Sequence, residues 1–322
     1  MSVVRFSLLL TLAIVAAAAL SLIAGKVWVP FDAWRATDPR WLIIVELRLP
    51  RTVLAIIIGA ALGLSGAAMQ GYLRNPLADP GLFGVSAGAA LGAVLSLYFG
   101  FAVSALVLPA FALAGAAGTM LILALLAGRS GSLIVFALAG VIVSSVAGSL
   151  TALAISVAPT PFAVTEIVTW LMGALTDRSW DDVKIALPLV VLGGVMIAAT
   201  ARSLDALTLG EAAARSMGVD PARLQWLIVG GVGLCIGASV AAAGIIGFVG
   251  LMVPHMVRRV VGGRPSATLL PSALGGALLL LLADIACRAI PTVSELRLGI
   301  AMALLGGPFF LWLLASMRRT LA

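Results

Sequence analysis

The stretch TVLAIIIGAALGLSGAAMQGYL, residues 52–73, contains no Asp, Glu, Lys or Arg. An α-helix needs about 20 mostly apolar residues to cross the hydrocarbon core of a bilayer. Comparable uncharged runs occupy residues 6–25, 80–128, 130–165, 224–257 and 298–317, and several are long enough for two passes. Because these runs are continuous rather than alternating, they predict membrane-spanning helices and not the strands of a β-barrel.

The composition agrees with that prediction. Of the 322 residues, 62% are hydrophobic and 10% are charged, and the mean hydropathy is +1.19. A soluble domain carries roughly 25% charged residues, so much of this apolar surface must face lipid. The net charge of +7 could indicate nucleic-acid binding, but the basic residues stand at the ends of apolar runs, where they act as topology signals. We therefore predict an integral membrane protein that does not bind nucleic acid.

The apolar runs divide into about ten predicted spans, which gives an all-α polytopic fold in a single domain, residues 1–322. The spans cover residues 6–25, 52–70, 84–100, 103–127, 133–157, 184–201, 224–243, 245–261, 267–289 and 297–316. The first run is longer than the roughly 7–15-residue core of a signal peptide, so we expect a retained helix. An even number of spans puts both termini on one side, and a slight excess of Lys and Arg in the inside loops favours the cytoplasm.

Two polar segments between the spans are informative. Residues 165–184, TEIVTWLMGALTDRSWDDVK, are amphipathic and suit a short helix that lies at the interface or caps a cavity. Residues 202–223, RSLDALTLGEAAARSMGVDPAR, form the only long polar segment on the predicted inside. Glu211 and Arg215 are spaced to pair on a helix that Gly210 and Gly218 bracket. Such a short exposed helix suits a docking role, although an ordinary loop is the alternative.

The sequence lacks the side-chain sets that catalysis would need. No nucleotide-binding loop of the form GxxxxGK followed by Ser or Thr occurs. Cys235 and Cys287 lie in apolar spans without a nearby thiol or histidine partner, so we predict buried free thiols and no metal site. The one histidine, His255, is better explained as structural than as catalytic. Asp284 and Arg288 are spaced to pair, which leaves few intramembrane carboxylates to couple an ion gradient.

Five blocks of this sequence resemble a single protein family. They are RLPRTVLAIIIGAALGLSGAAMQGYLRNPLADPGLFGVSAGAALG at 48–92, LGEAAARSMGV at 209–219, GIIGFVGLMVPHMVRRVVG at 244–262, LLLADIACR at 280–288 and ELRLGIAMALLGGPFFLWLL at 295–314. Together they resemble the membrane permease subunits of the ABC importers for iron siderophores, haem and vitamin B12. The blocks follow the family's order over nearly the whole chain, but Arg297 stands where many relatives have proline.

The resemblance implies a complete assembly around this chain. It implies a homodimer of ten-helix subunits in the bacterial inner membrane, with the pathway at the dimer axis. Two ATP-binding subunits would dock on the cytoplasmic side and hold ATP and magnesium, so that this chain binds no cofactor of its own. A periplasmic substrate-binding protein would deliver a large metal chelate, which alternating access would move inward.

The resemblance also assigns roles to individual positions. Contact with the ATPase would fall on Leu209, Gly210, Glu211, Arg215 and Gly218. Docking of the binding protein would fall on Arg48, Arg51 and Arg288. A cytoplasmic gate would lie near Ser132, Leu133 and Ile134. Small or weakly polar residues of the predicted spans are candidates for the pathway lining, namely Ser65, Met69, Gln70, Ser86, Ser144 and Ser145.

Two other functions remain open from the residues alone. One is an ion-coupled secondary transporter of a small solute, which would need an ion gradient instead of a separate ATPase. The other is a membrane-embedded transferase that acts on lipids, which would need a cluster of catalytic acids or bases. The choice among a ferric siderophore, haem and a cobamide as cargo also stays open, because selectivity would rest mostly on the binding protein.

Overall fold

Within the residues that the computed structural model describes, every regular element is a helix. The described residues are 2–25, 27, 29–35, 37–101, 106–127, 133–291 and 294–321. The α-helices are α1 Val3–Ile23, α2 Leu49–Tyr72, α3 Val85–Tyr98, α4 Val107–Ala127, α5 Leu133–Ser156, α6 Pro161–Leu171, α7 Trp180–Ala199, α8 Ala201–Leu207, α9 Glu211–Ser216, α10 Pro221–Ala243, α11 Val249–Val261, α12 Pro265–Ala289 and α13 Leu298–Leu321. Three short helical segments join them: η1 Phe31–Ala33, η2 Ile43–Arg48 and η3 Pro80–Phe83.

Each of the ten predicted spans overlaps one of these helices, which confirms the all-helical membrane fold. Within the described part of the chain, seven helical stretches are long and apolar enough to cross a membrane: Val3–Ile23, Ile43–Tyr72, Val107–Leu126, Val135–Ser156, Trp180–Ala199, Pro221–Ala243 and Pro265–Ala289. The other three predicted spans contain α3, α11 and α13. Of these, α3 and α11 are short because each begins after a break: residues 73–79 and η3 precede α3, and the irregular residues 244–248 precede α11.

The predicted amphipathic helix at 165–184 needs a correction. The structure places a helix earlier, at Pro161–Leu171, and residues 172–179 are irregular before α7 begins at Trp180. The Thr160 side chain caps the first of these helices, and Ser179 forms a capping box with Asp182 at the start of the second. Hydrophobic periodicity did not show these boundaries, because side-chain caps fix them.

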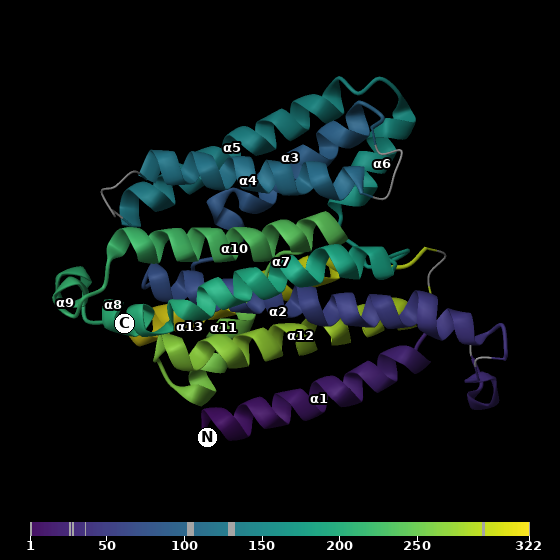
Figure 1. Ribbon diagram of the computed structural model, residues 1–322, viewed down its shortest axis with the longest axis horizontal. Helices are drawn as coiled ribbons and strands as arrows, with labels where there is room; N and C mark the ends of the chain where they lie inside the picture. Colours follow the sequence, from purple (N-terminus) through teal and green to yellow (C-terminus); the bar gives the residue numbers. More distant parts are fainter. Residues whose placement is uncertain are drawn as a thin grey trace.

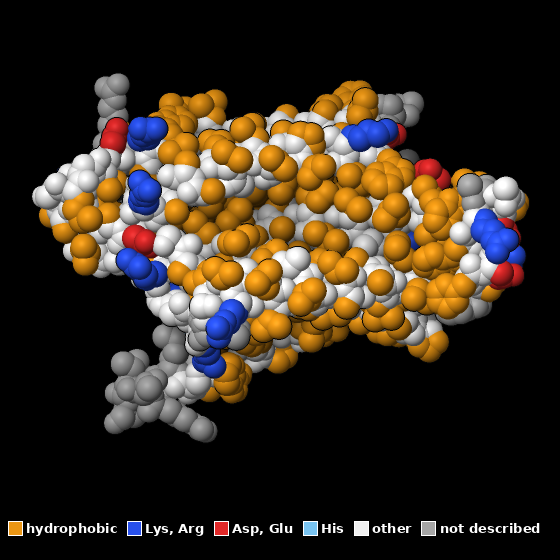
Figure 2. Space-filling model, turned by 60° about the horizontal axis from the view of Figure 1, so that its bottom comes forward, with side chains coloured by type: hydrophobic (Ala, Val, Ile, Leu, Met, Phe, Trp, Pro, Cys, Tyr) orange, Lys and Arg blue, Asp and Glu red, His pale blue; other side chains and the backbone are white. Residues whose placement is uncertain are grey.

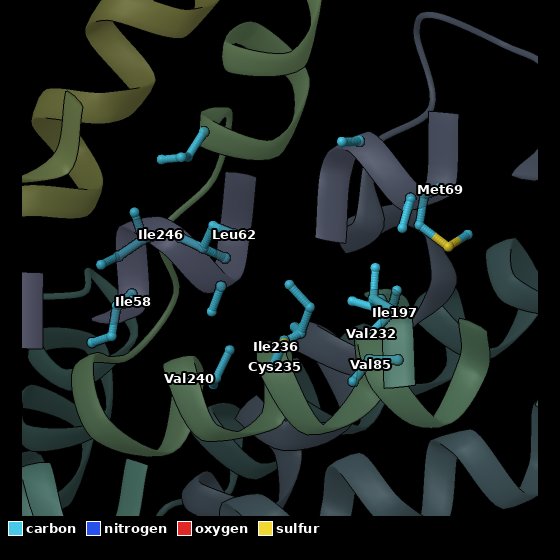
Figure 3. Close-up of a cluster of buried hydrophobic side chains, with 14 of the residues drawn as sticks. Ile58, Leu62, Met69, Val85, Ile197, Val232, Cys235, Ile236, Val240 and Ile246 are labelled. Carbon is cyan, nitrogen blue, oxygen red and sulfur yellow. The ribbon is translucent and has the colours of Figure 1, made fainter. Parts of the chain in front are cut away.

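The long helices lie side by side along the longest axis of the molecule (Figure 1). The centre is formed by α2 and α10, and 78% of the most apolar stretch of each is buried. Their side chains Ile58, Leu62, Cys235, Ile236 and Val240 pack together with residues of neighbouring segments (Figure 3). In contrast, only 17% of the corresponding stretch of α1 is buried, so α1 lies at the margin of the bundle.

The surface has the distribution of charge that a membrane protein requires. In the view of Figure 2, hydrophobic side chains cover the middle of the molecule, and the Lys, Arg, Asp and Glu side chains gather at its two ends. Large apolar side chains are exposed along this belt, including Leu12, Leu125, Val195 and Leu304. In water such a belt would be unfavourable, whereas in lipid it needs no cover.

Small residues allow a close helix contact between α2 and α12. A Cβ atom added at Gly63 would lie 2.1 Å from the Ser272 carbonyl oxygen, and one added at Gly59 would lie 2.3 Å from the Gly276 carbonyl oxygen. The four-residue spacing of Gly59 and Gly63 puts both glycines on the face of α2 that meets α12. Close approach of this kind lets two backbones gain dispersion contacts that lipid cannot supply.

The two ends of the molecule differ. The amino and carboxyl termini lie at the same end as α8 and α9 (Figure 1). The opposite end carries η1, α6 and the irregular residues 172–179. We call the end with α8 and α9 the coupling end, and the opposite end the α6 end.

Candidate functional site

A cavity of about 460 Å³ lies midway along the helices. Leu62 of α2, Ser144 and Ser145 of α5 and Ile236 of α10 line it from the interiors of their helices. The breaks between α-helices supply the rest of the wall, from Asp79 and the first two residues of η3 and from residues 245–248 before α11. Non-helical backbone at membrane depth is tolerated only where protein buries it or where it lines a cavity, so these interruptions mark this space as a functional one.

The cavity divides the six predicted lining residues into two groups. Ser86, Ser144 and Ser145 line it. Ser65, Met69 and Gln70 do not, because they lie on the buried side of α2 with at most 2% of their surface exposed. The sequence could not make this distinction, because all six are small or weakly polar residues within apolar runs.

Gln70 has a structural position instead. Its side-chain amide donates to the carbonyl oxygens of Gly250 and Leu251, at 3.3 Å each, and its carbonyl accepts from Arg258 at 3.1 Å. These bonds attach α2 to both ends of α11, whose first turn supplies Gly250 to the cavity wall. Gln70 therefore fixes α11, and with it the part of the cavity wall that Gly250 forms, against α2.

Several cavity residues were not predicted from the sequence as pathway residues. Asp79 is the one charged residue among the described residues that line the cavity, and its Oδ1 accepts from the Gly81 amide at 2.7 Å. Phe248 has a left-handed backbone with φ of 67°, which is strained for a residue with a bulky side chain. The glycines at 244, 247 and 250 were the available signal, since they interrupt an otherwise apolar run.

A buried network of ion pairs lies at the α6 end. The Arg51 guanidinium is 2.8 Å from a carboxylate oxygen of Asp284 and 2.8 Å from one of Glu295. Arg288 pairs with Asp284 at 3.0 Å, which confirms the pairing predicted from their spacing. Thr176 donates to Glu295 at 3.3 Å. The network joins α2, α12, the segment before α13 and the loop after α6.

The predicted docking arginines occupy this end, but two of them are not on the surface. Arg48 is 7% exposed and donates to the carbonyl oxygens of Leu22, Ile23 and Val27, while Arg288 is 5% exposed and donates to Ser21 and Ala24. Both guanidiniums close the carboxyl end of α1, where helix carbonyls lack partners. Little of either side chain is open to a partner protein in this conformation, whereas Arg51 keeps a partly open position.

A pocket of about 240 Å³ collects the charges of this region. Arg48, Arg51, Arg178 and Arg288 line it together with Asp177 and Glu295. Burial lowers the pKa of the Arg178 guanidinium, and the nearby carboxylates of Asp182 and Asp177 oppose that shift. The lining carries more positive than negative side chains, so the pocket attracts acidic groups.

At the coupling end, the segment 202–223 contains the predicted short exposed helix between glycines, and most of α8 precedes it. The helix is α9, and Gly210 and Gly218 have φ of 101° and 86°, values that side chains disfavour. Leu209 and Met217 flank the helix with 67% and 63% of their surface exposed. Exposed large apolar residues on a protruding turn are typical of a docking site.

The predicted Glu211–Arg215 pair is replaced by a different contact. Glu211 lies 3.6 Å from Arg74, which follows α2 and has a left-handed backbone with φ of 51°. A groove of about 660 Å³ runs beside the helix, lined by Arg202, Asp205, Leu209, Met217, Arg264 and neighbouring residues. The exposed pair Leu209 and Met217 and this charged groove thus lie at the segment predicted to dock the ATPase, residues 209–218.

The remaining predicted residues are the two cysteines, the histidine and the three gate residues. Cys235 and Cys287 are free and buried, as expected. His255 packs edge-on against the ring of Phe309, with ring centroids 6.1 Å apart. Of the predicted gate, Ser132 lies outside the described residues, and for Leu133 and Ile134 the structure describes only the backbone at the start of α5.

The fold and its mid-membrane cavity define a multi-pass membrane permease. A profile of the FecCD transport family matches residues 11–316. The Fe(3+) dicitrate transport system permease protein FecD of Escherichia coli is 40% identical over 96% of this chain and 98% of its own length. The vitamin B12 import system permease protein BtuC of Salmonella paratyphi A is 38% identical over 98% of this chain and 96% of its own length.

A solved structure gives the same result. An inward-facing metal-chelate type ABC transporter superposes with a TM-score of 0.89 at 32% identity, covering 97% of this chain and 99% of that one. The chain belongs to the FecCD transport family and is a permease subunit of an ABC importer. The comparisons give no support to an ion-coupled secondary transporter.

Proposed function

We propose that this chain forms the path by which a large metal chelate enters the cell, driven by ATP that separate subunits hydrolyse. The observation that carries the proposal is the cavity midway along the helices, walled by serines and interrupted backbone. A weakly polar wall binds a bulky cargo loosely, which allows the cargo to leave again. The named cargoes of the relatives, ferric dicitrate and vitamin B12, are both chelates of a metal.

The ATP-binding subunits dock at the coupling end, on residues 209–218. Leu209 and Met217 supply apolar surface there, and the adjacent groove supplies charge. In this assembly the ATPase holds ATP and magnesium, and the permease binds no cofactor. The coupling end is then cytoplasmic, and because both termini lie at that end, they are cytoplasmic as well.

The α6 end faces a substrate-binding protein. Its pocket with an excess of arginines attracts acidic side chains of such a partner. Two copies of the chain form a homodimer in which the cavities of both face a shared path. The choice of chelate rests with the binding protein, because a single carboxylate and three serines give the cavity little means of discrimination.

The first test is ATP hydrolysis. The purified chain alone should hydrolyse no ATP and should gain activity when the ATP-binding subunit is added. Hydrolysis by the chain alone, in a preparation free of contaminating ATPase, would refute the proposal.

The second test concerns the docking segment. Glu211→Lys or Gly218→Trp should abolish uptake and co-purification of the ATPase, because the first reverses a charge and the second forces a side chain into a left-handed turn. Gly100→Trp is the matched control, since Gly100 also has positive φ and has no neighbouring atoms within 4 Å, but it follows α3 at the α6 end. Normal uptake and normal ATPase binding in both docking variants would contradict the assignment.

A further inference from the structure

Three segments meet backbone to backbone at the α6 end of the cavity. They are the turn after α6, the break between α10 and α11, and the first residues of α13. The Ala174 amide donates to the Ala243 carbonyl oxygen at 2.8 Å, and the Gly299 amide donates to the Gly173 carbonyl oxygen at 3.1 Å. The contacts link residues that are far apart in sequence, and we call this cluster the glycine junction.

The junction is possible only because three of its members lack side chains. A Cβ atom at Gly173 would lie 2.2 Å from the Ile245 carbonyl oxygen, and one at Gly244 would lie 2.4 Å from the Trp170 carbonyl oxygen. A Cβ atom at Gly299 would lie 2.2 Å from the Met172 carbonyl oxygen. In each case the obstacle is backbone, which cannot turn aside as a flexible side chain can.

The junction lies between two open spaces. On its inner side, residues 245–248 continue directly into the wall of the 460 Å³ cavity. On its outer side, Trp170, Ala174 and Thr176 line a separate pocket of about 530 Å³, which also contains Glu166, Asp177, Arg178 and Arg297. The outer pocket carries charged side chains, whereas the inner cavity is weakly polar. The glycine junction therefore separates a charged outer pocket from a weakly polar inner cavity.

We infer that the glycine junction is the seal that closes the path between the cavity and the α6 end, and that it separates in each transport cycle. The inference rests on the proposed function, because the import of a cargo through the cavity requires this route to open. Two backbone hydrogen bonds and close van der Waals contact are enough to exclude solvent, yet each such bond contributes only about 0.5–1.5 kcal/mol net. A contact of this kind can open and close, whereas the buried ion network beside it holds the surrounding helices together.

A reversible cross-link tests the inference directly. Ala174→Cys and Ala243→Cys would be combined in a chain with Cys235→Ala and Cys287→Ala, because the hydrogen bond between these backbones brings them within reach of a disulfide. Oxidation should abolish uptake, and a reductant should restore it, while the ATPase stays bound throughout. Uptake that continues at the reduced rate in fully cross-linked protein would overturn the inference.

The matched control is a disulfide between two helices that we do not expect to separate during transport. Ser21→Cys and Thr52→Cys replace a buried hydroxyl pair, 2.7 Å apart, between α1 and α2. The uptake of each double-cysteine variant is compared with that of its own reduced form, so any effect of the substitutions themselves is the same on both sides of the comparison. Oxidation of the Ser21→Cys, Thr52→Cys variant should leave its uptake unchanged. If the reduced variants and the unmodified chain all lack ATP-dependent uptake, the proposed function fails and not the seal.

A second measurement decides the matter if the double-cysteine chain does not assemble. In a Ser86→Cys background, Gly299→Ala should force the junction apart and speed labelling of the cavity thiol by a membrane-impermeant maleimide added outside cells. Gly307→Ala is the control, since it lies on the same helix with no atom within 4 Å of the added Cβ. Equal labelling rates in the two variants would overturn the inference.

Discussion

Asp284 is the centre of the buried ion network, and its removal gives the sharpest test of how that network acts. The carboxylate is 1% exposed and forms ion pairs with two arginines: Arg51 at 2.8 Å and Arg288 at 3.0 Å. Asp284→Asn keeps the shape but removes the charge, so Arg51 retains only Glu295 and Arg288 retains no carboxylate. Removing one partner of a buried ion pair typically costs about 3–5 kcal/mol, because the remaining charge stays desolvated.

The expected result is a large loss of thermal stability. A destabilisation of about 3–5 kcal/mol corresponds to a decrease in Tm on the order of 5–10 °C for a chain of this size. Scanning fluorimetry of the purified permease in detergent measures this value.

Asp38→Asn is the matched control, since Asp38 pairs with Arg40 at 2.7 Å but the two side chains are 23% and 50% exposed. Exposed pairs contribute roughly 0–1 kcal/mol, so its Tm should hardly change. If the two variants lose the same amount, the network does not stabilise the α6 end.

Three other predictions follow from the same contacts. Gly63→Leu should prevent assembly, measured as loss of a monodisperse peak in size-exclusion chromatography, because its Cβ meets backbone at 2.1 Å; Gly118→Leu, in open space, should not. Ser145→Trp should block uptake by filling the cavity, whereas Ser149→Trp, one turn further along α5 and outside the cavity, should spare it. Arg51→Glu should weaken docking of the binding protein most at low ionic strength, where charge attraction is least screened; equal binding at low salt would contradict a docking role.

The buried arginines show what the sequence alone does not distinguish. Arg48, Arg51 and Arg288 are alike in sequence, each at the boundary of an apolar run, and all three were predicted as docking residues. The carboxyl end of α1 leaves carbonyl groups without helical partners, and Arg48 and Arg288 satisfy them. Hydropathy and charge counts carry no information about which guanidinium is turned inward, because that depends on a helix far away in the sequence.

The sequence by itself determined the features that depend on neighbouring residues. Uncharged runs located the spans, since bilayer insertion depends on the hydrophobicity of about 20 consecutive residues. Two glycines located α9, and a four-residue spacing paired Asp284 with Arg288.

Only the tertiary structure decided the contacts between distant segments. It paired Arg51 with Asp284 across 233 residues of sequence, and it turned Ser86 toward the cavity and Ser65 away from it. It also brought Gly173 and Gly244, from two separate loops, together with Gly299 at the start of α13. The physical reason is that lipid and protein interior are both apolar, so hydrophobicity does not fix the rotation or register of a packed helix, and only the fit of one backbone against another does.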